Sequence, residues 1–106
     1  MRIEVEENDD FTEAQWSLIQ TYLRAFRIVV KREALYGSAW TDYGVHDKAM
    51  HCRDIARRID HMTVSLFDQD YTTRAGEIEK LEDLFLDLIN YAAMGAVQVV
   101  QGKFGS

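Results

Sequence analysis

The sequence of 106 residues contains no proline and only one cysteine. Because proline breaks helices, its absence beside long stretches of helical periodicity predicts an all-α fold. Cys52 has no second cysteine to pair with, which excludes an internal disulfide and favours a reducing compartment.

A targeting or membrane-spanning segment is also not expected. The N-terminal residues show no signal-peptide pattern, and the longest apolar run, near the C-terminus, is interrupted by Asn90, Tyr91 and Gln98. We therefore expect a cytoplasmic protein without a membrane span.

The chain has no strongly basic region that would bind bulk nucleic acid. Its formal net charge is −6. Residues 1–13 carry one basic and six acidic side chains, whereas residues 24–58 carry eight basic and four acidic ones. Bulk nucleic acid is therefore an improbable partner. A basic segment facing acidic residues would instead suit a phosphate bound through a metal ion.

Helical periodicity predicts one domain, a small bundle of three main helices at about residues 12–36, 47–67 and 76–101. Residues 1–10 are expected to form an acidic arm and residues 102–106 a tail. Thr12 and Gln15 have the spacing of a capping box, and Asp47 is the expected N-cap of the second helix. Gly37 is the expected left-handed cap of the first.

A polar stripe runs along the third predicted helix into its most apolar half. Glu79, Asp83, Asp87 and Asn90 share one face, and beyond Asn90 the helix is apolar on nearly all sides. A carboxylate at this boundary costs several kcal/mol unless a cation or hydrogen-bond donors satisfy it. The stripe therefore indicates either a functional site or a polar lock between helices. Glu33, within the apolar arc of the first helix, is a second candidate for a functional role.

The third helix also carries more apolar surface than three short helices can cover. This predicts a homo-oligomer, a dimer or a tetramer, formed through the first and third helices. The side chains expected at its surface are Leu86, Ile89, Ala93, Val97 and Val100.

Three stretches carry a more specific pattern: KREALYGSAW, HCRDIARRID and EDLFLDLINYAAMGA, one from each predicted helix region. Together they resemble the nucleotide modification associated domain 1 family, small helical proteins that are common in phages. More distantly, they resemble the all-α nucleotide pyrophosphohydrolases of the MazG and dimeric dUTPase type. If the chain is phage-encoded, the cytoplasm in question is that of the host cell.

The resemblance implies Mg²⁺-dependent hydrolysis of a nucleoside triphosphate or a related nucleotide. In the distant relatives, paired carboxylates on two helices bind Mg²⁺. Asp87 matches one of these carboxylates, Asp83 lies one turn before it, and Glu33 alone occupies the place of the other pair. The resemblance thus implies that these three hold the metal, with Asp87 and Glu33 acting in catalysis.

The remaining predicted site residues would bind substrate. Lys48 or Arg58 would meet phosphate oxygens, and Trp40 would stack on the base. Tyr36 and Asn90 would complete the site.

Two other functions fit the same residues. The incomplete carboxylate set suits a protein that binds a nucleotide, or a nucleotide-derived immune signal, without hydrolysing it and so acts in counter-defence. Alternatively, the polar stripe is structural, Asp87 pairs with an arginine such as Arg58, and the chain serves as an interaction protein.

Overall fold

The computed structural model describes residues 10–67 and 75–105 of the chain. Within these ranges it contains three α-helices, one short 3-10 helix and no strand, which confirms the predicted all-α fold. The elements are α1 (Glu13–Tyr36), η1 (Ala39–Asp42), α2 (Val45–Phe67) and α3 (Ala75–Val100).

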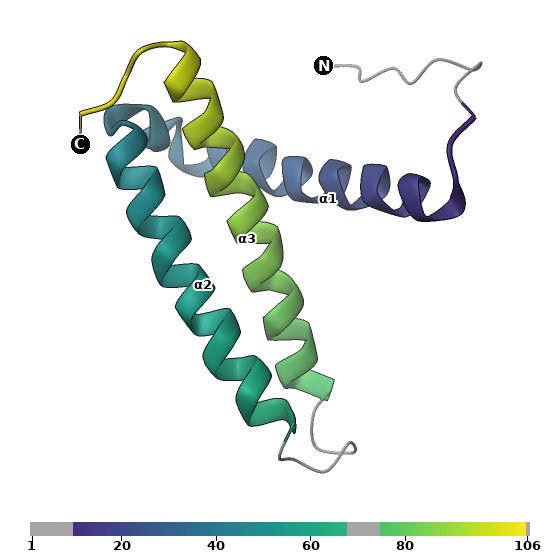
Figure 1. The fold of residues 1–106 in the computed structure, drawn as a ribbon. Helices are drawn as coiled ribbons and strands as arrows, with labels where there is room; N and C mark the ends of the chain where they lie inside the picture. Colours follow the sequence, from purple (N-terminus) through teal and green to yellow (C-terminus); the bar gives the residue numbers. More distant parts are fainter. Residues whose placement is uncertain (1–9, 68–74, 106) are drawn as a thin grey trace.

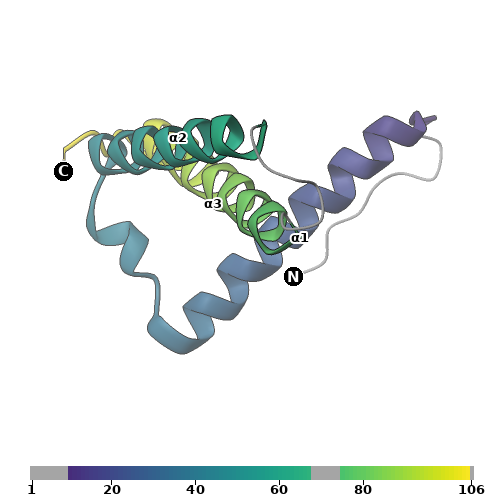
Figure 2. The same cartoon turned by 90° about the horizontal axis from the view of Figure 1, so that it is seen from below.

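The helices α2 and α3 lie side by side and run in opposite directions, whereas α1 crosses α3 (Figure 1). Seen from below, the N-terminal half of α1 projects away from the other two helices (Figure 2). The last turns of α1 and the short η1 lead to the start of α2. The crossing of α1 and α3 therefore lies on one side of the α2–α3 pair.

Local sequence determines both ends of α1, as predicted. Thr12 and Gln15 form the reciprocal capping box, and Phe11 packs edge-on against Trp16 with ring centroids 5.4 Å apart. At the other end, Gly37 has a φ of 76° and donates its backbone N–H to the carbonyl of Glu33. A positive φ at this position strongly favours glycine.

The start of α2 differs from the prediction, because the helix begins at Val45 and not after Asp47. The predicted N-cap at Asp47 is therefore wrong: this residue lies inside the first turn, where its negative charge still favours the positive end of the helix dipole. The backbone N–H groups of Val45 and His46 donate to the carbonyls of Lys103 and Phe104, at 2.9 and 3.3 Å. Residues predicted as a tail thus cap α2.

Gly44 allows the C-terminal residues to approach this closely. Gly44 is buried, and a Cβ atom there would collide with the carbonyl oxygens of Lys103 and Gly105. The absence of a side chain is therefore required at this point. The contact joins the end of the segment that contains η1 to the residues that follow α3.

The hydrophobic core of the described residues is small. Only Ala25, Ile55 and Leu86 are buried apolar residues. The burial of Leu86 contradicts its prediction as part of an oligomer surface, because this side chain faces the chain's own core. The C-terminal half of α3 is not enclosed within the chain, since Val97, Val99 and Val100 are exposed.

The apolar helix α3 meets a simple criterion for a membrane span. The segment Gly76–Val100 has the length and the apolar composition needed to cross a membrane. Its most apolar stretch has a mean hydropathy of 1.3, and 17% of that stretch is buried inside the structure. A core helix of a soluble protein passes the same criterion, so one such helix is weak evidence for a span.

Candidate functional site

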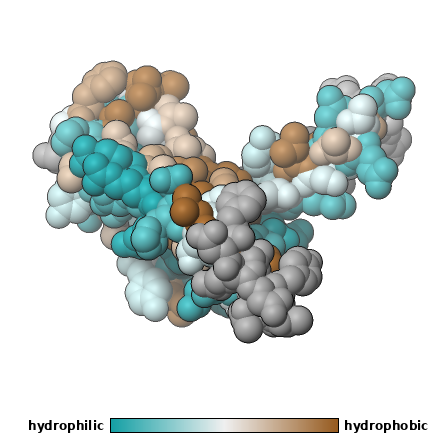
Figure 3. Space-filling model, turned by 60° about the horizontal axis from the view of Figure 1, so that its bottom comes forward, coloured by the Kyte–Doolittle hydropathy of each residue, from teal (hydrophilic) through white to brown (hydrophobic). Residues whose placement is uncertain are grey.

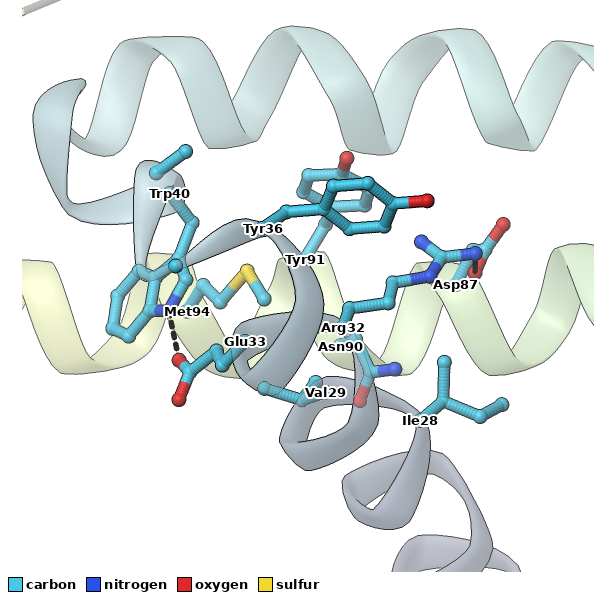
Figure 4. A pocket seen from close by; sticks show the side chains of 12 residues that line it. Ile28, Val29, Arg32, Glu33, Tyr36, Trp40, Asp87, Asn90, Tyr91 and Met94 are labelled. Atoms are coloured by element: carbon cyan, nitrogen blue, oxygen red, sulfur yellow. Dashed lines mark hydrogen bonds and ion pairs between the residues drawn. The ribbon is translucent and has the colours of Figure 1, made fainter.

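A cavity of about 180 Å³ lies between the last turns of α1, η1 and the middle of α3. Figure 4 shows Trp40 and Glu33 at one end, Arg32 and Asp87 at the other, and aromatic rings between them. The side chains that line it include three aromatic and four polar ones: Tyr36, Trp40, Tyr91, Arg32, Glu33, Asp87 and Asn90. Five of the residues predicted for the site therefore share one cavity, namely Glu33, Tyr36, Trp40, Asp87 and Asn90.

At one end of the cavity, Trp40 fixes the orientation of the Glu33 carboxylate. The indole Nε1–H of Trp40 donates to Oε1 of Glu33 at 2.7 Å. Both side chains are partly buried. This bond explains why an acidic residue lies within the apolar arc of α1: its charge is met by a donor from the next element of the chain. The second carboxylate oxygen, and the remaining lone pairs, can still accept hydrogen bonds.

At the opposite end, Asp87 forms an ion pair with Arg32 and not with Arg58. The separation between Arg32 Nη2 and Asp87 Oδ1 is 3.8 Å, and the two side chains are 61% and 31% exposed. Both groups are therefore open to solvent and to a ligand. Arg58, the expected partner of Asp87 in a buried lock, is exposed on α2 and does not line the cavity.

A second, more open hollow of about 510 Å³ continues from this end. It shares Ile28, Arg32 and Asp87 with the cavity and adds Lys31, Leu35 and Asp83. The candidate carboxylates are thus divided: Glu33 and Asp87 line the cavity, whereas Asp83 and Asp87 line the hollow. In the described parts of the chain, no group of three or more His, Cys, Asp or Glu side chains is placed to hold a metal ion.

Asn90 forms the polar lock that the sequence allowed. Its side-chain Nδ2 donates to the backbone carbonyl of Ala25 at 3.0 Å, and both residues are buried. The bond joins α3 to α1 at their crossing and so holds the two walls of the cavity together. Asn90 therefore has a structural function in addition to any contact with a ligand.

Lys48, predicted to bind phosphate, lies outside the cavity and is only 1% exposed. Its Nζ donates to the carbonyl of Tyr43 and to Oδ2 of Asp47, both at 3.0 Å. The ammonium group is thus occupied within the protein, and it fixes the backbone at the end of η1.

Sequence reasoning missed the function of Gln98. This side chain is fully buried, and its Nε2 donates to the carbonyls of Tyr43 and Trp40, at 2.6 and 3.3 Å. Gln98 thereby holds the segment that carries Trp40 against α3. The available signal was a lone amide in the apolar half of α3, where an unpaired polar group would be costly.

The ring of Tyr91 packs against a side chain of α2. The ring of His51 stacks on the Tyr91 ring with centroids 4.4 Å apart and an interplanar angle of 10°. His51 Nε2 is in turn 3.6 Å from Oδ1 of Asp47.

The thiol of Cys52, the next residue of α2, does not favour a reactive role. Its partial burial raises the pKa of the thiol by desolvation, which disfavours the reactive thiolate.

Comparison with known proteins gives no match: no protein-family model, no curated protein and no solved structure is significantly similar to this chain. The resemblance to the nucleotide modification associated domain 1 family therefore stays a prediction.

Proposed function

We propose that the cavity binds a nucleotide or a nucleotide-derived small molecule without hydrolysing it. The observation that carries this proposal is the grouping of three aromatic rings, Tyr36, Trp40 and Tyr91, with the guanidinium of Arg32 in one cavity. Aromatic side chains stack on nucleobases, and a guanidinium matches the geometry of phosphate oxygens. The resemblance to nucleotide-handling families points to the same class of ligand.

The dimensions of the site suggest how such a ligand is divided between the two spaces. The cavity of about 180 Å³ is smaller than most sites for whole ligands of nucleotide size, which measure roughly 300–1,000 Å³. The base therefore occupies the cavity, near Trp40 and Glu33. The phosphates extend past Arg32 into the adjoining hollow, where Lys31 adds a second cation.

A second candidate function is Mg²⁺-dependent hydrolysis of the same ligand. It is favoured by one observation, that Asp83 and Asp87 line the hollow assigned to the phosphates. Two carboxylates fit a Mg²⁺ ion only where phosphate oxygens and water supply its other ligands. The carboxylate set supports binding more than catalysis, because Glu33 is held by Trp40 at the far end of the cavity.

A structural function is the third candidate, favoured by the bond between Asn90 and Ala25. Under any of the three functions, we propose that the protein acts in the cytoplasm, where nucleotides are abundant. Binding without hydrolysis would serve counter-defence if the chain is phage-encoded.

Calorimetric titration with a nucleotide panel tests the proposal. The panel contains mono-, di- and triphosphates of the common bases and a cyclic dinucleotide, each with and without Mg²⁺. We expect Tyr36→Ala to lower the affinity about 5- to 150-fold, the equivalent of about 1–3 kcal/mol of stacking. Tyr43→Ala is the matched control, because Tyr43 is also exposed and lies outside the cavity.

Chromatography of the ligand after incubation separates the candidates. Recovery of intact nucleotide supports binding without hydrolysis, and release of pyrophosphate supports the enzyme. If no member of the panel binds to the unaltered protein, the proposal is wrong and the structural function is favoured.

A further inference from the structure

The carboxylate of Glu33 keeps most of its hydrogen-bonding capacity for a ligand. Its Oε1 atom accepts from the indole Nε1–H of Trp40 at 2.7 Å, the bond that the dashed line in Figure 4 marks. Among the described residues, no lysine or arginine forms an ion pair with Glu33, and its Oε2 atom has no hydrogen-bond partner. A carboxylate can accept about four hydrogen bonds. The cavity therefore presents a charged acceptor with one of its positions taken.

The cavity offers this carboxylate no competing cation. Arg32, its neighbour in the sequence, directs its guanidinium toward Asp87 at the opposite end (Figure 4). Val29 and Met94 contribute apolar side chains to the same cavity. In partly apolar surroundings, a hydrogen bond to a charged acceptor is stronger than in water. A ligand with donors at this point would supply what the chain does not.

The common nucleobases differ in the donors that they offer to such an acceptor. On its Watson–Crick edge, guanine carries the N1–H group and the 2-amino group side by side, which makes two adjacent donors. Adenine and cytosine each place one amino group beside a ring nitrogen that is an acceptor. Uracil and thymine place one N–H group between two carbonyls. Because a carboxylate only accepts, it repels these acceptors, and guanine fits it best.

We propose that Glu33 makes the cavity selective for guanine, and that its ligand is a guanine nucleotide. The inference rests on the proposed function, because it requires that the cavity binds the base of a nucleotide. Glu33 is then the residue that determines specificity. Tyr36 and Tyr91 stack on the base whatever its identity, and Arg32 meets the phosphates.

Calorimetric titration with guanosine, inosine and adenosine monophosphates tests the inference on the unaltered protein. Inosine differs from guanosine only in lacking the 2-amino group, so the ratio of their affinities isolates one hydrogen bond to Glu33. A bond to a charged group should make guanosine monophosphate bind about 10- to 150-fold more tightly than inosine monophosphate. Adenosine monophosphate, whose N1 atom is an acceptor, should bind no more tightly than inosine monophosphate.

The substitution Glu33→Gln assigns the preference to this residue. The amide oxygen can still accept from Trp40, which leaves the amide NH₂ group, a donor, to face the base. We expect the ratio of guanosine to inosine affinity to fall to about one or below, because this donor meets the 2-amino group. Xanthosine monophosphate has a carbonyl in place of that amino group and should bind to the variant better than guanosine monophosphate.

The substitution Glu13→Gln is the matched control. Glu13 is the first residue of α1 and lies roughly 30 Å from Glu33 along the helix. It is exposed, and hydrophilic side chains gather at the outer end of this projecting arm (Figure 3). Both substitutions remove one negative charge, but only the one in the cavity should change the ratio of affinities.

Equal affinity for guanosine and inosine monophosphates, or a preference for adenosine monophosphate, would overturn the inference and leave the proposed nucleotide site standing. A preference for guanosine that persists in Glu33→Gln would overturn it too, since another group would then read the base. If no nucleotide binds, the proposed function and the inference fail together. If Glu33→Gln does not fold, Glu33→Asp decides. Its carboxylate keeps the charge but is one methylene shorter, so the ratio should fall, and an unchanged ratio contradicts the role of Glu33.

Discussion

Two polar regions beside α3 differ in how far their hydrogen-bond donors are paired within the chain, although the Oε1 atom of Gln98 has no partner. At the C-terminal end, Lys48 and Gln98 are almost entirely enclosed, and both donate to the same carbonyl, that of Tyr43. In the cavity near the middle of the helix, Arg32 and Asp87 remain open to solvent, and Glu33 uses one oxygen for Trp40. We call these regions the closed end and the cavity.

The difference separates structural polar residues from candidates for function. A buried donor that already has its acceptors would lose them on binding a ligand, and breaking such bonds costs about 1–3 kcal/mol for each group left unpaired. Groups that are half-exposed and have spare hydrogen-bonding capacity bind a ligand at lower cost. The closed end should therefore determine stability, whereas the cavity should determine binding.

The largest effect is expected at the closed end, from Lys48→Ala. The substitution removes a long buried side chain and two hydrogen bonds, so the free energy of unfolding should fall by about 2–5 kcal/mol. Urea unfolding measures it. Lys31→Ala is the matched control, because Lys31 lies on the surface of α1, and it should change stability by less than about 0.5 kcal/mol. Equal effects of the two substitutions would remove the distinction between the closed end and the rest of the chain.

A smaller loss of stability is expected from a substitution of Gly37, which lines the cavity in the turn between α1 and η1. Its backbone has φ 76° and ψ −175°, a conformation that is essentially restricted to glycine. A Cβ atom there would meet no atom within 4 Å, so the effect of Gly37→Val is due to the backbone alone, at about 1–3 kcal/mol of lost stability.

Gly76→Val is the control for Gly37→Val. A Cβ atom at Gly76 would also meet open space, but the φ of Gly76 is not positive and the residue lies in the first turn of α3. The valine should be neutral or slightly stabilising there, because glycine is a poorer helix former. An unchanged melting temperature for Gly37→Val would mean that the turn before η1 is not strained by a side chain.

The elements were predictable from sequence because their signals are local. The capping box of Thr12 and Gln15 and the glycine at the end of α1 act over three or four residues. Long-range contacts were not predictable in this way. The carbonyls that cap α2 come from residues nearly sixty positions later, so the sequence around Asp47 could not reveal where that helix begins.

The candidate site, too, was predictable from sequence only where its signals are local. Glu33 and Asp87 are recognisable because each is a charge beside an apolar helix face, and both line the cavity. Their partners, Trp40 and Arg32, depend on the turn at η1 and on the crossing of α1 and α3. The prediction that Lys48 binds phosphate rests on its charge alone, whereas its burial follows from the docking of η1 and the C-terminal residues around it.

The smallest effect on stability is expected in the cavity, from Asp87→Asn. The substitution keeps the shape of the side chain and removes its charge. Because Asp87 and Arg32 are 3.8 Å apart and both partly exposed, their ion pair is screened by water, and its loss should cost less than about 1 kcal/mol. A buried lock between the same groups would instead cost about 3–5 kcal/mol on losing one partner.

Thermal melts in EDTA, with Mg²⁺, with nucleotide, and with both together distinguish these cases. In EDTA we expect Asp87→Asn to melt within about 4–8 °C of the unaltered protein, the shift that 1 kcal/mol produces in a domain of this size. Mg²⁺ alone should stabilise neither protein, because the described carboxylates form no group able to hold it unaided. Asp54→Asn, on the exposed face of α2, is the control.

With nucleotide and Mg²⁺ together, the unaltered protein should show the largest increase in stability of all four conditions. A ligand at about 100 times its dissociation constant adds about 2.7 kcal/mol to the folded state. If Asp83 and Asp87 help to hold a Mg²⁺ ion against the phosphates, Asp87→Asn should lose the part of this gain that depends on Mg²⁺, and Asp54→Asn should keep it. A mutant that is already several kcal/mol less stable in EDTA, beside an unaltered protein indifferent to every ligand, would make Asp87 a structural residue. The cavity would then belong with the closed end.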